Sequence, residues 1–466
     1  MLALAITSCS AWAEFHVNKI GDSLVDAEAL TIKGMFGSCI NGKSYQQDAV
    51  ISYKNYQYVA YYDGERQVCV GRRKLPKGAW QSIRFKDYDF KSDDGHNMFS
   101  IGICPQDGTI HLSFDHHAND LHYRVSRKDV ATNPETVEWD ASIFRPIQSE
   151  LESGKRVTKL TYPRFWQTPD GGLQFSYRRG GSGNGESMLV DYDGKAGTWS
   201  GTRQINSGQG VFDDGKGHSR SRNAYPNGYT FDSNGTLHTT WVWREGAETA
   251  NHDLMYAYSK DRGNTWLNNS GHTIEGLARV DTPGITVANI NPAHGLPSMH
   301  GQAVDSLGRI HTVMLHCTHE SLVAVGSMAG ETRWGLATAR RYHHYWRDSN
   351  GKWQHQELPW VAGNRAKVFI DKRDNVYLIY GEQHEVSGSE KYYGPLNLCI
   401  AAATKNAKYA DWKVIYREKA TFFNEMLIDP YRWKVDGILS VMVQEHPKDP
   451  RQSTQLRILD FTIGEQ

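Results

Sequence analysis

Residues 110–117 read Ile110-His111-Leu112-Ser113-Phe114-Asp115-His116-His117, in which apolar and polar side chains alternate before a polar end. Alternation with a period of two is typical of a β-strand that buries one face. A turn at Asp107-Gly108 precedes this run, and a second apolar stretch separates that turn from Asp94-Gly95-His96-Asn97. The two stretches predict a β-hairpin, which brings His96 and His117 to the same edge of a sheet.

The same alternating strand recurs along the chain, each time after a turn. About seven copies follow one another at intervals of roughly 50 to 75 residues, a period typical of β-propeller blades. The other copies begin near Tyr58, Leu173, Leu237, Ile310, Val376 and Ile438. We therefore predict an all-β fold, a seven-bladed β-propeller built from four-stranded antiparallel blades.

One turn is specific for this class of fold. Ser259-Lys260-Asp261-Arg262-Gly263-Asn264-Thr265-Trp266 matches the S-x-D-x-G-x-T-W Asp-box of sialidase-like propellers, in which Asp and Gly form the turn and Trp packs between strands. The run Leu456–Ile463 has no later partner, and the run Ala27–Ile32 has no earlier one. We expect these two runs to pair and close the ring, because closure removes exposed sheet edges.

The charge balance argues against nucleic-acid binding. Lys plus Arg and Asp plus Glu both number 52, so the formal net charge is zero and no global basic field attracts nucleic acid. No window reaches the roughly 18 continuous apolar residues that a membrane span needs. We expect a monomer without a membrane span, in which an anionic partner is bound by a local patch.

The amino terminus predicts export. Met1–Ala13 is apolar and uncharged, and Ala11-Trp12-Ala13 has the small-x-small form of a signal-peptidase site. We therefore expect a signal peptide over residues 1–13, a secreted or periplasmic protein, and one catalytic propeller domain over residues 14–466. Two alternatives stay open: an apolar N-terminal strand, or a lipoprotein cleavage site that makes Cys9 a lipid anchor.

Titratable and aromatic side chains gather where the predicted hairpins start and end. In a β-propeller these positions share one rim near the axis, where a cleft on a rigid scaffold is expected. His111, His238 and His311 occupy equivalent places in three copies, so we interpret them as structural. The candidate rim residues are His96, His116, His117, Tyr162, Arg178, Arg179, Ser182, Tyr225 and Arg244.

These residue types fit eliminative cleavage of a polyuronate better than hydrolysis. Glycoside hydrolysis usually uses two carboxylates, and no Asp-Glu pair stands out beside the rim arginines and tyrosines. Elimination needs a cation against the uronate carboxylate, a base for the C5 proton and an acid for the leaving O4. Arg178 suits the first role because a guanidinium pairs two-pronged with a carboxylate, and His and Tyr suit the others. A sialidase-like glycoside hydrolase and a non-catalytic glycan-binding propeller remain alternatives.

The rim motifs resemble a known family. The segments that carry the resemblance are Asp94-Gly95-His96-Asn97, the run at 108–117, Tyr162-Pro163, Tyr177–Gly185 and Asn223-Ala224-Tyr225-Pro226. They are similar to the BNR-repeat propeller polysaccharide lyases, the ulvan lyases of polysaccharide lyase families 24 and 25, and more to family 25. The resemblance runs from about Asp48 into the C-terminal copies. It implies a secreted enzyme of marine bacteria that cleaves ulvan between 3-sulfated rhamnose and glucuronic or iduronic acid, leaving an unsaturated uronyl end.

The resemblance also implies roles for individual residues. His96 and Tyr162 become the acid and the base, in an order left open, and Arg178 neutralises the uronate carboxylate. His117 becomes a second catalytic imidazole in contact with the substrate, with its neighbour His116 as the alternative. The residues expected to bind substrate are His116, Arg179, Ser182, Tyr225 and Arg244.

The fifth copy carries a separate group of metal-ligand residue types. His300, His316, Cys317 and His319 are predicted on one edge, and zinc accepts this mixture of nitrogen and sulfur ligands. Their spacing matches no common zinc motif. A bound zinc, or calcium, would stabilise the rim, since elimination can proceed on Arg, His and Tyr without a cofactor. Apart from Cys9 the chain holds five cysteines, so at least one stays free or binds a ligand.

Overall fold

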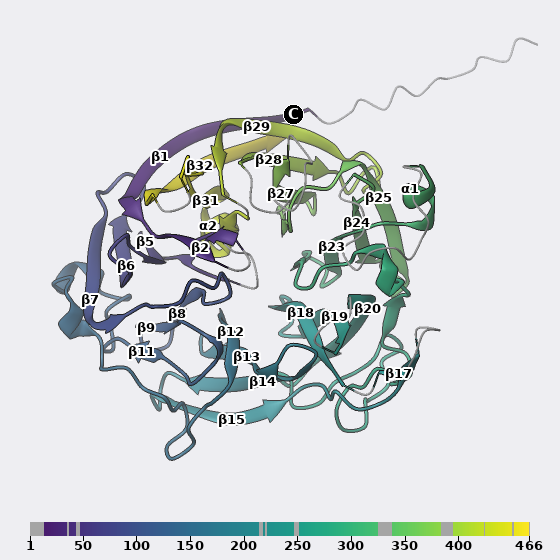
Figure 1. The fold of residues 1–466 in the computed structure, drawn as a ribbon, viewed down its shortest axis with the longest axis horizontal. Helices are drawn as coiled ribbons and strands as arrows, with labels where there is room; N and C mark the ends of the chain where they lie inside the picture. Colours follow the sequence, from purple (N-terminus) through teal and green to yellow (C-terminus); the bar gives the residue numbers. More distant parts are fainter. Residues whose placement is uncertain are drawn as a thin grey trace, which may run out of the picture.

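Strands follow one another around a ring that encloses a central axis (Figure 1). The structure is a computed structural model, and the residues that it describes are 14–34, 37–42, 47–213, 218–219, 221–246, 251–324, 338–383, 395–423, 425–449 and 452–465. The expected signal peptide at residues 1–13, with Cys9, lies outside these residues. Within the described ranges no helix is both long enough and apolar enough to span a membrane.

Seven antiparallel blades make up the ring, which confirms the seven-bladed β-propeller. Counted outward, the first strand of each blade lies near the axis and the last strand forms the outer wall (Figure 1). Four blades, the first, fourth, fifth and sixth, hold four consecutive strands each. The first contains β4 (Val50–Tyr53), β5 (Tyr56–Tyr62), β6 (Gln67–Lys74) and β7 (Gln81–Asp89), and the fourth contains β18 (Arg222–Phe231), β19 (Leu237–Glu245), β20 (Asn251–Ser259) and β21 (Thr286–Ala288). The fifth contains β22 (Gly301–Val304), β23 (Ile310–His316), β24 (Arg341–Arg347) and β25 (Trp353–Val361), and the sixth contains β26 (Lys367–Ile370), β27 (Val376–Gln383), β28 (Leu396–Ala403) and β29 (Lys413–Phe422).

The second and third blades depart from this pattern. The second has three strands, and the third gains a fifth from the segment that joins two strands of the second blade. Their strands are β8 (Phe99–Cys104), β9 (Thr109–Phe114) and β11 (Tyr123–Val125), then β10 (His117–Asn119), β12 (Leu160–Gln167), β13 (Leu173–Gly181), β14 (Asn184–Asp193) and β15 (Thr198–Gln204). Strand β10 lies between β9 and β11 in the chain but pairs with β12 of the third blade, where His117 lies opposite Thr161. The two blades are thus joined at the rim where the site is expected.

The chain ends close the ring, as predicted. The last blade contains β30 (Leu427–Ile428), β31 (Ile438–Gln444), β32 (Thr454–Glu465) and β1 (Phe15–Ala29), with β1 antiparallel to β32. The strand expected at residues 27–32 in fact begins at Phe15, and residues after Ala29 form the short pair β2 (Thr31–Gly34) and β3 (Gly37–Cys39). Most of β1 is exposed or half-buried because it is an outer strand, so its apolar pattern is weak.

The remaining elements are short and lie in the connections. They are the helices α1 (His319–Ala324) and α2 (Pro430–Asp436), the 3-10 turns at Pro134–Thr136, Ala141–Ile143 and Pro292–His294, and the strands β16 (Phe212–Asp213) and β17 (His218–Ser219). The turn at Ser259–Trp266 is closed by Asp261, whose carboxylate accepts hydrogen bonds from the Thr265 hydroxyl and backbone N–H. Trp266 is 5% exposed and packs in an apolar cluster, as the sequence pattern predicts.

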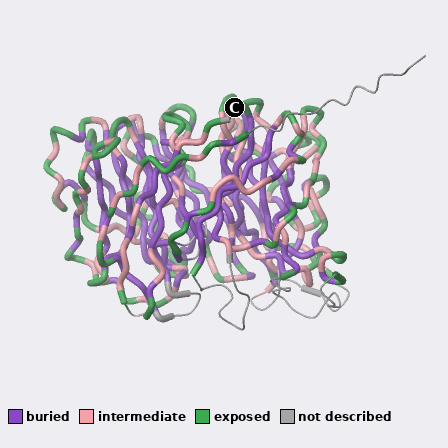
Figure 2. The backbone as a smooth tube through the Cα atoms, turned by 90° about the horizontal axis from the view of Figure 1, so that it is seen from above, coloured by how far each residue is buried: buried purple, intermediate pink, exposed green. Residues whose placement is uncertain are grey.

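The core lies within and between the blades (Figure 2). The three histidines expected to be structural, His111, His238 and His311, are buried, and their Nδ1 atoms contact Tyr123 Oη at 2.6 Å, Tyr256 Oη at 2.8 Å and His344 Nε2 at 3.0 Å. These contacts cross to neighbouring strands, so the histidines hold strands together. The cysteines within the described ranges are Cys39, Cys69, Cys104, Cys317 and Cys399, all free and buried.

Candidate active site

The site begins at the loop that leads into β8. Asp94 caps this loop, because its Oδ1 accepts a hydrogen bond from the backbone N–H of His96 at 2.9 Å. The other end of the hairpin, after β9, carries His117 at the start of β10. The predicted hairpin therefore brings His96 and His117 together, and their rings stack with centroids 4.3 Å apart and planes 18° apart.

One carboxylate holds both imidazoles. Oδ1 of Asp94 lies 2.6 Å from His96 Nδ1, and Oδ2 lies 2.6 Å from His117 Nδ1. Burial alone would raise the pKa of Asp94, but the hydrogen bonds from His117 and His96 outweigh it and hold the pKa far below its ordinary value. An ionised carboxylate accepts a hydrogen bond from each Nδ1–H, and in that tautomer the lone pair of the ring lies on Nε2, the atom directed away from Asp94.

Tyr162 lies next to this pair on a strained stretch of β12. Its ring centroid is 6.0 Å from that of His96, and its side chain is largely buried. The pairing of β12 with β13 shifts between Thr161 and Arg164, and Tyr162 in this irregularity has φ of +59°. A bulky residue in the left-handed region is uncommon, and such strain collects at functional sites. The bulge sets the direction of this side chain at the rim.

Arg178 lies behind Tyr162 on the neighbouring strand. Thr161 and Arg178 are opposite each other in the β12–β13 pair, and the guanidinium carbon is 4.9 Å from the Tyr162 ring centroid. Arg178 Nη2 donates to Thr161 Oγ1 at 2.9 Å, and Nη1 donates to Tyr225 Oη at 3.1 Å. These bonds hold the guanidinium in one place and use only part of its five N–H groups.

Tyr225 extends the site to the fourth blade. Its hydroxyl lies 3.0 Å from Ser182 Oγ, so Ser182, Tyr225 and Arg178 form a connected group. Burial alone would raise the pKa of Tyr225, but the positive charges of Arg178 and Arg244 outweigh it and lower the pKa below its ordinary value. The structure thus brings together six of the predicted residues, His96, His117, Tyr162, Arg178, Ser182 and Tyr225, with Arg244 close enough to act on Tyr225 electrostatically.

Two residues expected to bind substrate lie elsewhere. His116 is fully buried, its Nε2 accepts the backbone N–H of His122 at 2.9 Å, and burial holds its pKa well below the ordinary value. Arg179 is paired with Glu186 at 2.5 Å, and its side chain is about half exposed. Adjacent residues of a strand point to opposite faces, so Arg179 cannot share the position of Arg178. Of the two neighbouring histidines, the structure places His117 at the rim.

The predicted metal ligands of the fifth blade do not converge. His316 Nδ1 contacts the carbonyl of Cys317 at 2.9 Å, its Nε2 contacts Tyr345 Oη at 3.1 Å, and its ring stacks on His343 at 3.7 Å. Across the described chain, the group of three His, Cys, Asp or Glu residues with ligand atoms within 4.8 Å of one another is Asp94, His96 and His117. No three of His300, His316, Cys317 and His319, all within the described ranges, meet that criterion. The 2.6 Å contacts of Asp94 are hydrogen-bond distances, so a metal there would have to displace them.

Sequence reasoning missed the role of Asp94. The residue stands in the motif Asp94-Gly95-His96-Asn97, and an Asp followed by a Gly is a common turn signal. Its second contact, to His117, spans 23 residues and depends on how the hairpin closes. Spacing alone does not reveal a carboxylate that serves two histidines.

Several known proteins are similar to this chain in sequence. The BNR repeat-containing family matches residues 56–361 of the chain. A long-isoform ulvan lyase of Alteromonas sp is 29% identical over 267 residues, which cover 48% of this chain and 26% of that protein. A long-isoform ulvan lyase of Pseudoalteromonas sp. (strain PLSV) is 31% identical over 190 residues, covering 33% of this chain and 19% of that protein. The matches thus span less than a third of the length of these relatives.

Solved structures share the fold over nearly the whole chain. The crystal structure of the polysaccharide lyase Uly1 superposes with a TM-score of 0.71 at 18% identity, covering 95% of this chain and 99% of that one. An ulvan lyase of polysaccharide lyase family 25 superposes with a TM-score of 0.65 at 12% identity, covering 94% of each chain. At these identities the likeness establishes the arrangement of blades.

Proposed function

We propose that this chain, which belongs to the BNR repeat-containing family, is a polysaccharide lyase that cleaves ulvan by β-elimination at the bond between 3-sulfated rhamnose and glucuronic or iduronic acid. The observation that carries the proposal is the convergence of the Asp94-held His96 with Tyr162 and Arg178 on one rim. The named relatives and the fold support the same reaction class.

Arg178 is the electrophilic partner of the reaction. A uronate carboxylate placed against its remaining N–H groups is neutralised, which acidifies the C5 proton and stabilises the charge that develops when this proton leaves. Tyr225 and Thr161 hold the guanidinium, so little reorganisation is needed during the reaction. The carboxylate then lies near both Tyr162 and the histidine pair.

His96 is the base in this proposal and Tyr162 the acid. Asp94 leaves the lone pair of His96 on Nε2, which takes the C5 proton. The electrons of the C5–H bond form the C4=C5 double bond as the C4–O4 bond breaks, and the Tyr162 hydroxyl gives its proton to O4. His117, held by the other oxygen of Asp94, contacts the sugar beside His96.

One assay separates lyase, hydrolase and binding protein. Purified protein is incubated with ulvan while the ultraviolet absorbance of the C4=C5 double bond and the reducing ends are followed together. Both signals rise for a lyase. Reducing ends without the absorbance would identify a glycoside hydrolase, and neither signal, together with retained ulvan binding, would leave a glycan-binding propeller.

Export belongs to the same proposal. The apolar, uncharged segment Met1–Ala13 supports a signal peptide, because it ends in a small-x-small sequence. A polysaccharide is too large to enter a cell, so its lyase acts outside the cytoplasm. The amino-terminal residue of the mature protein, determined by mass spectrometry, tests this: an end at Glu14 supports cleavage, and an intact Met1 contradicts it.

A further inference from the structure

The ring encloses a cavity that is separate from the rim that carries Tyr162 and Arg178. This cavity of about 1140 Å³ follows the central axis and is lined by the first strands of the blades, including β12, β18, β22 and β26. It reaches the turns that join first to second strands, at the opposite end of these strands from Tyr162. Asp94, His96, His117, Tyr162 and Arg178 are not among the residues that line it. The volume is ample for a small organic ligand.

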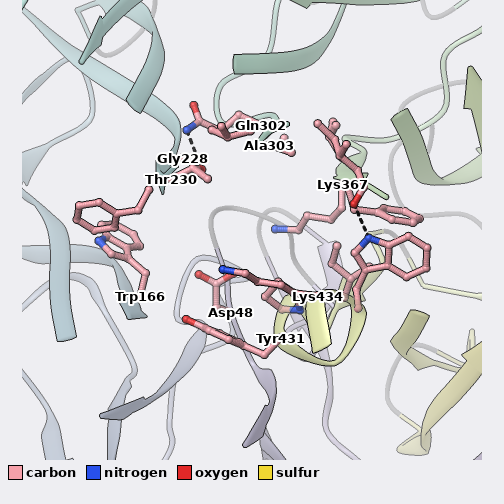
Figure 3. A pocket seen from close by; sticks show the side chains of 18 of the residues that line it. Asp48, Trp166, Gly228, Thr230, Gln302, Ala303, Lys367, Tyr431 and Lys434 are labelled. Atoms are coloured by element: carbon pink, nitrogen blue, oxygen red, sulfur yellow. Dashed lines mark hydrogen bonds between the residues drawn. The ribbon is translucent and has the colours of Figure 1, made fainter. Parts of the chain in front are cut away.

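Lys367, the first residue of β26, extends into this cavity (Figure 3). The side chain is half-buried, and no acceptor or carboxylate in the described part of the chain lies within hydrogen-bond or ion-pair distance of its ammonium group. Removing an ammonium from bulk water without a partner is costly. Among the described residues, the ammonium group of Lys367 therefore has no counter-ion.

The carboxylate that acts most strongly on Lys367 is already engaged. Asp48 faces the cavity, but its two oxygens accept from Arg164 Nε at 2.7 Å and from Arg164 Nη2 at 3.2 Å. Arg164, Asp48 and Lys367 together therefore carry one net positive charge. Burial lowers the pKa of Lys367 to about 8, a shift that Asp48 opposes and Arg164 increases. The ammonium form still predominates near neutral pH.

The cavity walls combine aromatic and polar groups. Trp166, Tyr431 and Trp433 line the cavity, as do Gln302 and Thr230. Figure 3 shows Gln302 across the view from Tyr431. Tyr431 Oη accepts the backbone N–H of Gln167 at 3.1 Å, and burial raises the pKa of Tyr431, so its hydroxyl keeps its proton. Aromatic faces with a few convergent polar groups are typical of sites for small ligands.

We propose that the central channel is a second ligand site, in which Lys367 pairs with the oxyanion group of a small acidic molecule. The shared chemistry is a sulfate or carboxylate oxygen that accepts from the ammonium group, with the Tyr431 hydroxyl on the facing wall as a further donor. The oxyanion comes either from a free inorganic ion or from an acidic monosaccharide. This site does not depend on the lyase reaction, because its residues are separate from those of the rim.

Isothermal titration calorimetry at low ionic strength tests the proposal on the full-length protein. Sodium sulfate and sodium glucuronate are titrated separately, with sodium chloride at matched ionic strength as the reference. Saturable binding of sulfate alone identifies a free oxyanion as the ligand, and saturable binding of glucuronate identifies an acidic sugar. We expect Lys367→Met to weaken that binding about tenfold or more, because it removes the charged donor while keeping the length of the side chain.

Lys372→Met is the matched control, since Lys372 is an exposed lysine at the mouth of the same cavity. It makes the same change in net charge and should leave binding within about twofold of the original protein. Lys367→Arg, which keeps the charge, should retain most of the binding. The proposal is overturned if neither anion binds saturably, or if the substitutions at Lys367 and Lys372 weaken binding equally. Ulvan cleavage is measured in parallel, and Lys367→Met should leave it unchanged.

Discussion

The rim holds two histidine-rich regions that look alike in sequence and differ in structure. Between the second and third blades, His96 and His117 share the carboxylate of Asp94. In the fifth blade, His316 instead stacks on His343, which contacts His355 Nε2 through its Nδ1 at 3.0 Å. The first pair has an ionised partner and Nε2 atoms directed away from it. The second group is a packed stack whose ring nitrogens contact one another, nearby backbone and the Tyr345 hydroxyl. Chemistry therefore depends on the partner of the imidazole more than on the number of histidines.

The largest expected effect comes from removing the hydroxyl of Tyr162, and the same substitution in the fifth blade serves as the comparison. We expect Tyr162→Phe to lower kcat on ulvan by about 10²- to 10⁴-fold, because the leaving O4 loses its proton donor. Tyr345→Phe is the counterpart in the fifth blade, where the hydroxyl contacts His316. It should keep kcat and lose about 1 kcal/mol of unfolding free energy, the net worth of one hydrogen bond. Near-native turnover in Tyr162→Phe would contradict the assigned role.

Two neighbouring arginines of β13, Arg178 and Arg179, allow a second comparison within one strand. Arg178→Asn should reduce kcat/KM by about 10²- to 10³-fold, because the uronate carboxylate loses its neutralising cation. Arg179→Asn should change kcat/KM by less than about twofold, since Arg179 pairs with Glu186 and exposed ion pairs contribute little. Circular dichroism establishes that both variants are folded. Equal losses of kcat/KM in the two variants would mean that Arg178 and Arg179 do not point to opposite faces of β13.

A smaller effect is expected at the carboxylate that distinguishes the two regions. Asp94→Asn should lower kcat by about 10- to 100-fold with little change in KM, because the amide no longer fixes the proton on Nδ1 of both histidines. Asp94→Glu, which retains the charge, should recover part of the rate. A change in KM alone would assign Asp94 to substrate binding, and an unchanged kcat would remove its proposed role in positioning the base.

The smallest effect is on stability and comes from the fifth blade. Burial lowers the pKa of His316 to about 3, so His316 is neutral in the folded protein and takes up a proton on unfolding below its ordinary pKa of about 6.5. Its contribution to stability is complete above about pH 6.5 and falls by about 1.4 kcal/mol per pH unit as the pH drops toward 3.

Urea unfolding at pH 7.5, 6.5 and 5.5 measures this dependence. His316→Gln should reduce the loss of unfolding free energy between pH 6.5 and 5.5 by about 1 kcal/mol. Asp94 stabilises the folded protein through a lowered pKa. This contribution to the free energy of unfolding is complete above about pH 4 and is lost only below it, so the ionisation of Asp94 adds no slope between pH 7.5 and 5.5. An unchanged slope in His316→Gln would mean that His316 is not held neutral.

Much of the site follows from strand register. Once His96 and His117 are placed at the two ends of one hairpin, and Tyr162 and Arg178 at the ends of the next, antiparallel pairing brings each pair together. Sequence reasoning also placed Arg179 at the site, through its position at the strand end beside residues 180–184, whereas alternation along the strand directs it away from Arg178 and its side chain pairs with Glu186. It grouped His316 with His300 because both stand at the rim of one blade, without information on which way their rings face.

The sequence by itself determined the number of blades, the closure of the ring and the strand ends at which His96, His117, Tyr162 and Arg178 meet. Each depends on local alternation, turn residues and the spacing of repeats, all of which are written along the chain. Only the tertiary structure decided that Asp94 serves two histidines, that β10 joins the third blade, and that Lys367 has no partner among the described residues around the central channel. These features depend on distances between blades and on burial, which arise when the strands pack around the axis.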